Sequence, residues 1–168
     1  MLIRLAIPTD APAIARVHVE TWQAAYRGQM PDALLDGLDV ASRTARWKEI
    51  FAKGESETFV VERSGEIIGF YTLMPSRDED ADKKSAGEIA AIYVSPPHWR
   101  RGAGRQLVRH AFAKARQDGY SAITLWVLTT NHPARKFYAA LGFKPDGATR
   151  IDRRHGPELH DTRYRAAL

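Results

Sequence analysis

Apolar positions along this chain recur with two spacings, one typical of strands and one typical of helices. A strand and amphipathic helices come first, and after Gly54 strands alternate with helices. The expected strands are Leu2–Ile7, Thr58–Arg63, Glu66–Met74, Glu88–Val94, Ala122–Leu128, Phe143–Ile151 and His160–Ala167. The expected helices run from Thr9–Asp10 to Tyr26 and over Pro31–Leu38, Ala41–Lys53, Gly102–Gln117 and Asn131–Leu141. This order predicts an α/β (α+β) fold in one domain over residues 1–168, with helices packed on a mixed sheet.

Length and composition are those of an ordinary soluble globular domain. The 168 residues suffice for one hydrophobic core, and 44% of them are hydrophobic and 27% charged. No apolar run reaches the ~20 residues that cross a bilayer, and the N-terminus lacks the apolar centre of a signal peptide. Cysteine is absent, which excludes disulfides and thiolate chemistry. We therefore expect a cytoplasmic protein with no membrane partner.

The charge pattern favours an anionic ligand. The formal net charge is +5 and the sequence pI about 9.6, which suits a small anion as well as a nucleic acid. No nucleic-acid-binding motif is present to support a nucleic-acid ligand, so we expect no nucleic-acid partner. The histidines show no metal-ligand spacing, so no metal is expected. The acidic run Asp78–Asp82 is interpreted as a solvated loop.

The turn Trp99–Arg105 has the chemistry of an anion site. It joins an expected strand to an expected helix, whose first backbone N–H groups are unpaired and carry partial positive charge. Glycines 102 and 104 let a ligand approach the backbone, and Arg100, Arg101 and Arg105 add charge. An ordinary turn with solvated arginines remains an alternative. The spacing fits neither the dinucleotide fingerprint nor the Walker loop.

A second segment, Asn131–Phe143, places Ala134, Phe137, Tyr138 and Leu141 on one helix face. Taken alone, its aromatic residues suit a protein core. Together the two segments resemble the GCN5-related N-acetyltransferase (GNAT) family. The family pattern is Tyr-Val-x-Pro, then Gly-x-Gly, then Asn-x-x-Ala-x-x-Phe-Tyr-x-x-x-Gly-Phe, and this chain matches it in order and spacing. The resemblance implies a mostly antiparallel, six- to seven-stranded sheet with helices on both faces and a splayed fourth and fifth strand.

The resemblance also implies that acetyl-CoA is the cosubstrate. Backbone N–H groups of the turn would hold its pyrophosphate, with Trp99 standing where the family often has Gln or Arg. The pantetheine arm would pair with the free backbone of the fourth strand, and Lys136 or Arg135 would meet the 3′-phosphate. The implied cosubstrate-binding residues are Ile92, Tyr93, Val94, Arg100, Arg101, Gly102, Ala103, Gly104, Arg105, Asn131, Ala134, Lys136 and Phe137.

The implied reaction is direct attack of a neutral amine on the thioester. Tyr138 is the candidate acid or hydrogen-bond donor to the leaving sulfur, and Glu88 is the candidate base, directly or through water. A strand-edge carboxylate with no catalytic part is the alternative for Glu88. Trp22 and Tyr26 are candidate aromatic walls for the amine, or core residues.

The expected function is an acetyl-CoA-dependent N-acetyltransferase acting on the primary amine of a small molecule. The alternatives are a non-catalytic acetyl-CoA-binding sensor or scaffold, and an enzyme that acetylates a protein or peptide. Many family members are dimers, which makes a homodimer one possible assembly. The sequence leaves the acceptor open.

Overall fold

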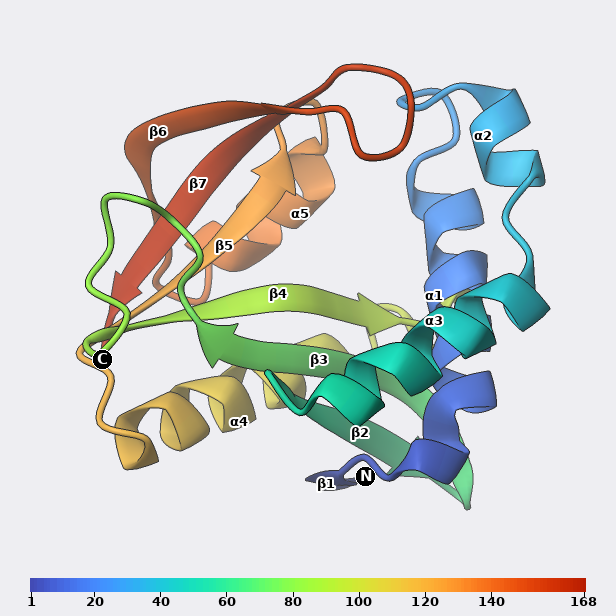
Figure 1. Cartoon of the computed structure of the whole chain (residues 1–168), viewed down its shortest axis with the longest axis horizontal. Coiled ribbons are helices and arrows are strands. Elements are labelled where there is room, and N and C mark those ends of the chain that lie inside the picture. The colour runs from blue at the N-terminus through green and yellow to red at the C-terminus, as the bar shows by residue number, and fades with distance from the viewer.

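All the alternating runs form strands, and they join one sheet in the order β1-β2-β3-β4-β5-β7-β6 (Figure 1). The computed structural model describes all 168 residues. The strands are β1 (Leu2–Leu5), β2 (Glu57–Arg63), β3 (Glu66–Pro75), β4 (Ala86–Val94), β5 (Ala122–Leu128), β6 (Lys144–Asp152) and β7 (Leu159–Ala167). The sheet is antiparallel except for the β4–β5 pair, so the expected mixed, mostly antiparallel sheet is confirmed.

The helices also lie where the apolar spacing predicts them. They are α1 (Ala11–Ala25), α2 (Asp32–Asp36), α3 (Val40–Lys53), α4 (Ala103–Gln117) and α5 (His132–Ala139), with short 3-10 turns at Pro8–Asp10 and Pro96–His98. The segment predicted over 31–38 is shorter, because it begins after Pro31 and ends at Gly37. No helix combines the length and the apolar character needed to span a membrane.

Helices cover both faces of the sheet, as expected, and each face has its own core. On one face, Leu107, Val108 and Ala111 of α4 pack with Ile123 and Leu125 of β5. On the other face, α1 and α3 pack on β2 and β3. The helices contribute Ile14, Val17 and Trp47, and the strands contribute Val60 and Phe70. Figure 1 shows α1 and α3 crossing in front of the sheet while α4 lies behind it.

The two parallel strands in the middle of the sheet separate soon after they meet. Their register contains only Ala86↔Ala122, Gly87↔Ile123 and Glu88↔Thr124. Opposite β3, the register steps from Ile89 to Ala91, so Ala90 is the extra residue of a β-bulge. The bulge bends β4 away from β5. Beyond Glu88 the β4 edge has no strand partner, which confirms the expected splay.

Candidate active site

The diverging ends of β4 and β5 border a cavity of about 1270 Å³. Its lining comes from α1, β4, the turn before α4, β5 and α5. The sequence-predicted residues that line it are Tyr26, Ile92, Tyr93, Val94, Arg100, Gly102, Gly104, Arg105, Asn131, Ala134, Lys136, Phe137 and Tyr138. Five predicted residues do not line it: Trp22, Glu88, Arg101, Ala103 and Arg135. The structure therefore gathers two sequence segments about thirty residues apart around one space.

The turn before α4 presents a run of free backbone donors. None of the N–H groups from Arg100 to Arg105 has an acceptor within the chain, and the first helical hydrogen bond is Gln106 N–H to the Gly102 carbonyl at 3.1 Å. Gly102 lies at φ +89°, a conformation that glycine adopts without strain. A Cβ on Gly104 would lie 3.2 Å from the Phe137 ring. The turn thus has the free donors and the close-approach glycines of a phosphate site.

Along the splayed part of β4, alternate residues turn their backbone groups toward the open edge. Ser95 N–H bonds to Ile68 of β3, so Val94 and Ile92 face away from β3. The Val94 carbonyl is already engaged: it accepts hydrogen bonds from the Thr21 hydroxyl at 3.0 Å and from the Trp99 indole N–H. The groups left free are the Val94 N–H and the amide of Ile92. Trp99 fixes the end of the strand and leaves the turn's backbone donors exposed.

The α5 side of the cavity carries Asn131 and Tyr138. Asn131 Oδ1 caps the helix by accepting the Ala134 N–H at 3.2 Å, and its side-chain amide has no hydrogen-bond acceptor in the protein. The Tyr138 hydroxyl lines the cavity and makes no hydrogen bond within the chain. Burial, and secondarily the nearby Tyr93, raise the pKa of Tyr138 well above its usual value. Tyr138 is therefore a protonated phenol with a free donor.

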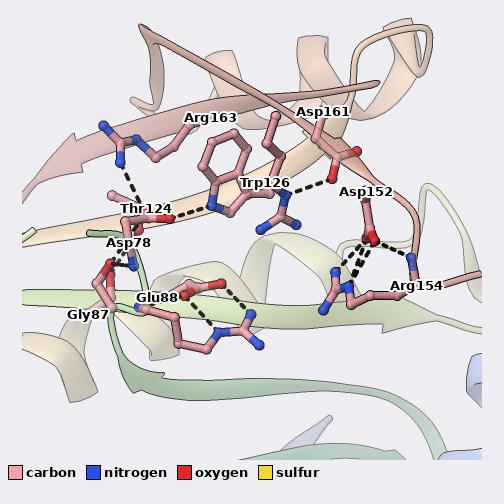
Figure 2. A network of polar contacts seen from close by, with 12 residues as sticks. Asp78, Gly87, Glu88, Thr124, Trp126, Asp152, Arg154, Asp161 and Arg163 are labelled. Atoms are coloured by element: carbon pink, nitrogen blue, oxygen red, sulfur yellow. Dashed lines mark hydrogen bonds and ion pairs between the residues drawn. The ribbon is translucent and has the colours of Figure 1, made fainter. Parts of the chain in front are cut away.

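Glu88 occupies the last position of β4 that pairs with β5 and is 2% exposed. The Arg77 guanidinium lies 2.6 Å and 3.1 Å from its two oxygens, and the Arg77 backbone N–H donates to it at 3.1 Å (Figure 2). Burial tends to raise the pKa of Glu88, but Arg77 outweighs it and holds the pKa below the ordinary value. The structure thus places Glu88 beside the cavity rather than on its wall.

The two aromatic residues predicted to flank the acceptor occupy different positions. Tyr26 lines the cavity, and burial together with Tyr93 and Tyr138 raises its pKa. Trp22 lies behind Tyr26, with the two ring centroids 5.3 Å apart, and packs with Met30 and Leu35. Tyr26 therefore lines the cavity, whereas Trp22 packs against Tyr26 from behind.

A polar network that the sequence did not reveal covers the β5–β7 side of the same face (Figure 2). Trp126 lines the cavity and donates its indole N–H to Asp78 at 2.9 Å, while the Arg150 guanidinium lies 4.4 Å from its ring centre. Arg163, 7% exposed, pairs with Asp80 at 2.6 Å. The expectation of a solvated acidic loop is therefore wrong for Asp78, which is mostly buried, whereas Asp80 stays exposed while it pairs with Arg163.

Asp161 of β7 is a further carboxylate on this face. Its Oδ2 accepts a hydrogen bond from Arg150 Nε at 3.1 Å, and its side chain is 12% exposed. Burial raises the pKa of Asp161, with Arg150 acting in the opposite direction. Only the pairing of β7 with β5 and β6 brings it here, so no local sequence signal marked it.

The split sheet, the free donors of the turn and the cavity between them define an α/β protein with a ligand-binding cavity beside an anion site. The sequence pattern of the acetyltransferase (GNAT) family matches residues 18–143. The chain therefore belongs to the GNAT family, and it is an acyltransferase.

Individual relatives agree with this assignment. The N-acetyltransferase YuaI of Bacillus subtilis is 33% identical over 139 residues, covering 82% of this chain and 77% of the relative. An amino-acid acetyltransferase of Pseudomonas putida is 35% identical over 106 residues, covering 63% of this chain and 22% of that protein. The structure of YncA from Salmonella typhimurium with its cofactor acetyl-CoA has a TM-score of 0.74 at 24% identity, over 100% of this chain and 94% of that one.

Proposed function

We propose that this chain, as one domain over residues 1–168, transfers the acetyl group of acetyl-CoA to the primary amine of a small molecule. The observation that carries the proposal is the run of unpaired N–H groups from Arg100 to Arg105 beside the unpaired edge of β4. Acetyl-CoA offers phosphates to the first, an amide-bearing arm to the second, and a thioester that an amine can attack.

The proposed contacts follow from which groups remain free. The turn's backbone donors and the exposed Arg100, Arg101 and Arg105 hold the pyrophosphate. Ile92 and the Val94 N–H pair with the arm, and the Asn131 side-chain amide donates to it. Arg135 is already used, because it donates to the Tyr164 hydroxyl at 3.1 Å and to the Thr129 carbonyl at 2.9 Å.

Lys136 is exposed, lines the cavity and has no partner, so of the two cations it is the proposed contact for the 3′-phosphate. Ala134 and Phe137 line the same wall beside it. Tyr93 contributes its ring to the opposite wall, and Ala103 contributes only its backbone N–H, since its side chain is buried.

Tyr138 is the proposed donor to the sulfur as the thioester bond breaks. Its raised pKa makes full proton transfer costly, so its hydroxyl acts by hydrogen-bonding the developing negative charge. A free backbone N–H of β4, that of Ile92, polarises the carbonyl; the neighbouring Tyr93 N–H faces β3. No nucleophilic side chain is required, because the amine itself forms the new bond.

Two carboxylates are candidates for taking the amine proton. Glu88 is the proposed base and acts through water, because it does not line the cavity. Arg77 lowers its basicity. Asp161 is the second candidate, because its raised pKa makes it the better proton acceptor at neutral pH. It does not line the cavity either, so it too would act through water.

The test is an acetyl-CoA-dependent screen of amines with detection of released thiol, followed by mass spectrometry of the product. Calorimetry with acetyl-CoA is run in parallel. Binding with turnover of at least one amine supports the proposal. Binding without turnover of any amine or peptide indicates a sensor or scaffold, and absence of binding rejects the cosubstrate.

A further inference from the structure

The buried polar atoms that lack partners all gather in one place. They are both ring nitrogens of His18 and the indole Nε1 atoms of Trp22 and Trp47, and no other buried side-chain nitrogen or oxygen in the protein is without a hydrogen bond. The His18 ring lies 5.3 Å from that of Trp22 and 6.2 Å from that of Trp47. Buried donors left unpaired are costly, so such a cluster calls for a ligand or water that satisfies them.

A guanidinium without a counter-ion lies against the same cluster. Arg43 of α3 sits 6.0 Å from the Trp22 ring centre and is the one arginine that is not exposed yet has neither a hydrogen bond nor an ion pair. Burial lowers the pKa of Arg43, which shows that the protein gives its charge little compensation. A half-buried cation of this kind favours an anionic partner.

The neighbouring carboxylates are not available for that role. Glu88 pairs with Arg77, Asp152 with Arg154, and Asp161 with Arg150. Each of these three acids therefore already has its own arginine (Figure 2). Arg43 has no such partner, so its own charge is left uncompensated.

The cluster adjoins the catalytic cavity through Tyr93. The Tyr93 ring stacks on His18 with centroids 4.9 Å apart, and the same residue lines the cavity with Tyr138. Burial raises the pKa of Tyr93, and the Arg43 guanidinium partly offsets that rise. Tyr93 thus lies between the unpaired cation and the residue proposed to act on the sulfur.

The loop between β6 and β7 covers the other side of the cluster. His155 packs edge-on against Trp22 with ring centroids 4.8 Å apart, and Figure 1 shows this loop reaching toward α1 and α2. The unpaired donors are therefore enclosed by α1, α3, β4 and this loop. A group bound there lies beside the acceptor end of the cavity, away from the turn Trp99–Arg105.

We propose that the acceptor is an amino acid whose carboxylate pairs with Arg43 and accepts a hydrogen bond from the Trp22 indole, while its amine faces the cavity past Tyr93. This inference rests on the proposed function. In the transfer, the carbonyl carbon–sulfur bond breaks, a carbon–nitrogen bond forms, and the amine loses one proton. The products are an N-acetyl amino acid and the free CoA thiol, with no further reactant.

The test compares acceptors that differ only by a carboxylate: phenylalanine with 2-phenylethylamine, methionine with 3-(methylthio)propylamine, and lysine with cadaverine. We expect kcat/KM to favour the amino acid by about tenfold or more in at least one pair. Arg43→Gln is expected to raise the KM for that amino acid by about 10- to 100-fold with kcat nearly unchanged. Arg43→Lys keeps the charge and should retain part of the preference.

Arg46→Gln is the matched control, because Arg46 lies on the same helix, is exposed and pairs with Glu49 at 2.8 Å. Its kinetics should equal those of the unsubstituted protein. If both members of every pair are used equally and Arg43→Gln has no effect, the proposed carboxylate-binding site at Arg43 is overturned. The N-acetyltransferase proposal is left intact.

A binding measurement covers the case in which no amine reacts, which would reject the proposed function. The same amino acids are titrated by calorimetry into the protein saturated with CoA. Binding that is lost in Arg43→Gln and kept in Arg46→Gln supports the carboxylate-binding site at Arg43 even without turnover. Absence of amino-acid binding to the unsubstituted protein overturns it.

Discussion

The Arg77 guanidinium hydrogen-bonds both carboxylate oxygens of Glu88, so the proposed base is an ion-paired carboxylate with a lowered pKa. Arg77→Met removes this charge and should raise the pKa of Glu88, because the main opposition to burial is then lost. If Glu88 takes the amine proton, the acid limb of kcat/KM must move to higher pH in this variant. The pH dependence of kcat/KM measures the shift.

Arg116→Met is the control, since Arg116 is exposed on α4 on the opposite face of the sheet. An acid limb that stays in place in Arg77→Met but disappears in Asp161→Asn would assign the base to Asp161. A limb insensitive to both variants would contradict both assignments.

Tyr138→Phe should lower kcat by about 100-fold while leaving the affinity for acetyl-CoA within a few-fold, because the hydroxyl donates only as charge develops on the sulfur. Steady-state kinetics and calorimetry separate the two effects. Tyr120→Phe is the control, because Tyr120 lies outside the cavity lining. Unchanged turnover in Tyr138→Phe would remove Tyr138 from the mechanism.

Gly102→Ala should weaken CoA binding and lower the free energy of unfolding by about 1 kcal/mol, since an L residue at φ +89° is strained. Gly65→Ala matches it: Gly65 lies at φ +80° in the β2–β3 hairpin, far from the turn, and also has open space around it. We expect both variants to lose stability and only Gly102→Ala to lose affinity. Chemical denaturation and calorimetry with CoA give the two quantities.

His18 should make the protein less stable in acid. Burial lowers its pKa to about 3 from an ordinary 6.5. Between those values the unfolded chain binds a proton that the folded chain does not, so the free energy of unfolding rises with pH. From pH 7 to pH 5 the expected loss from this residue is about 2 kcal/mol.

Urea titrations at the two pH values measure this loss. His18→Leu should remove that part of the pH dependence, whereas His132→Gln, at an exposed position, should keep it. Equal slopes in the unsubstituted protein and His18→Leu would contradict the assignment.

The sequence predicted the fold well because its elements are strongly periodic and its two motifs are local. The turn Trp99–Arg105 and the segment Asn131–Phe143 are each continuous, so their residues stay neighbours whatever the rest of the chain does. The limits of the short helices were less certain, since a proline or glycine such as Pro31 or Gly37 decides them.

The acceptor side was not predictable in the same way. Trp126, Arg150 and Asp161 meet only because β5, β6 and β7 pair, and Arg163 reaches Asp80 across 83 positions of sequence. The partner of Glu88 follows from a contact between two strand ends, and that contact changes the chemistry of the carboxylate. Arg43 stands out only once every other arginine that is not exposed has been matched to its hydrogen-bond acceptor.

The open edge of β4 also makes backbone protection a measure of cosubstrate binding. Without a strand partner beyond Glu88, the outward amides of Ile92 and Val94 exchange their hydrogens with solvent. A bound pantetheine arm stands in for the missing length of β5 and shields them. Hydrogen exchange should therefore slow at these two residues when acetyl-CoA is added, while Phe70 and Tyr71, in a strand paired on both sides, exchange slowly throughout.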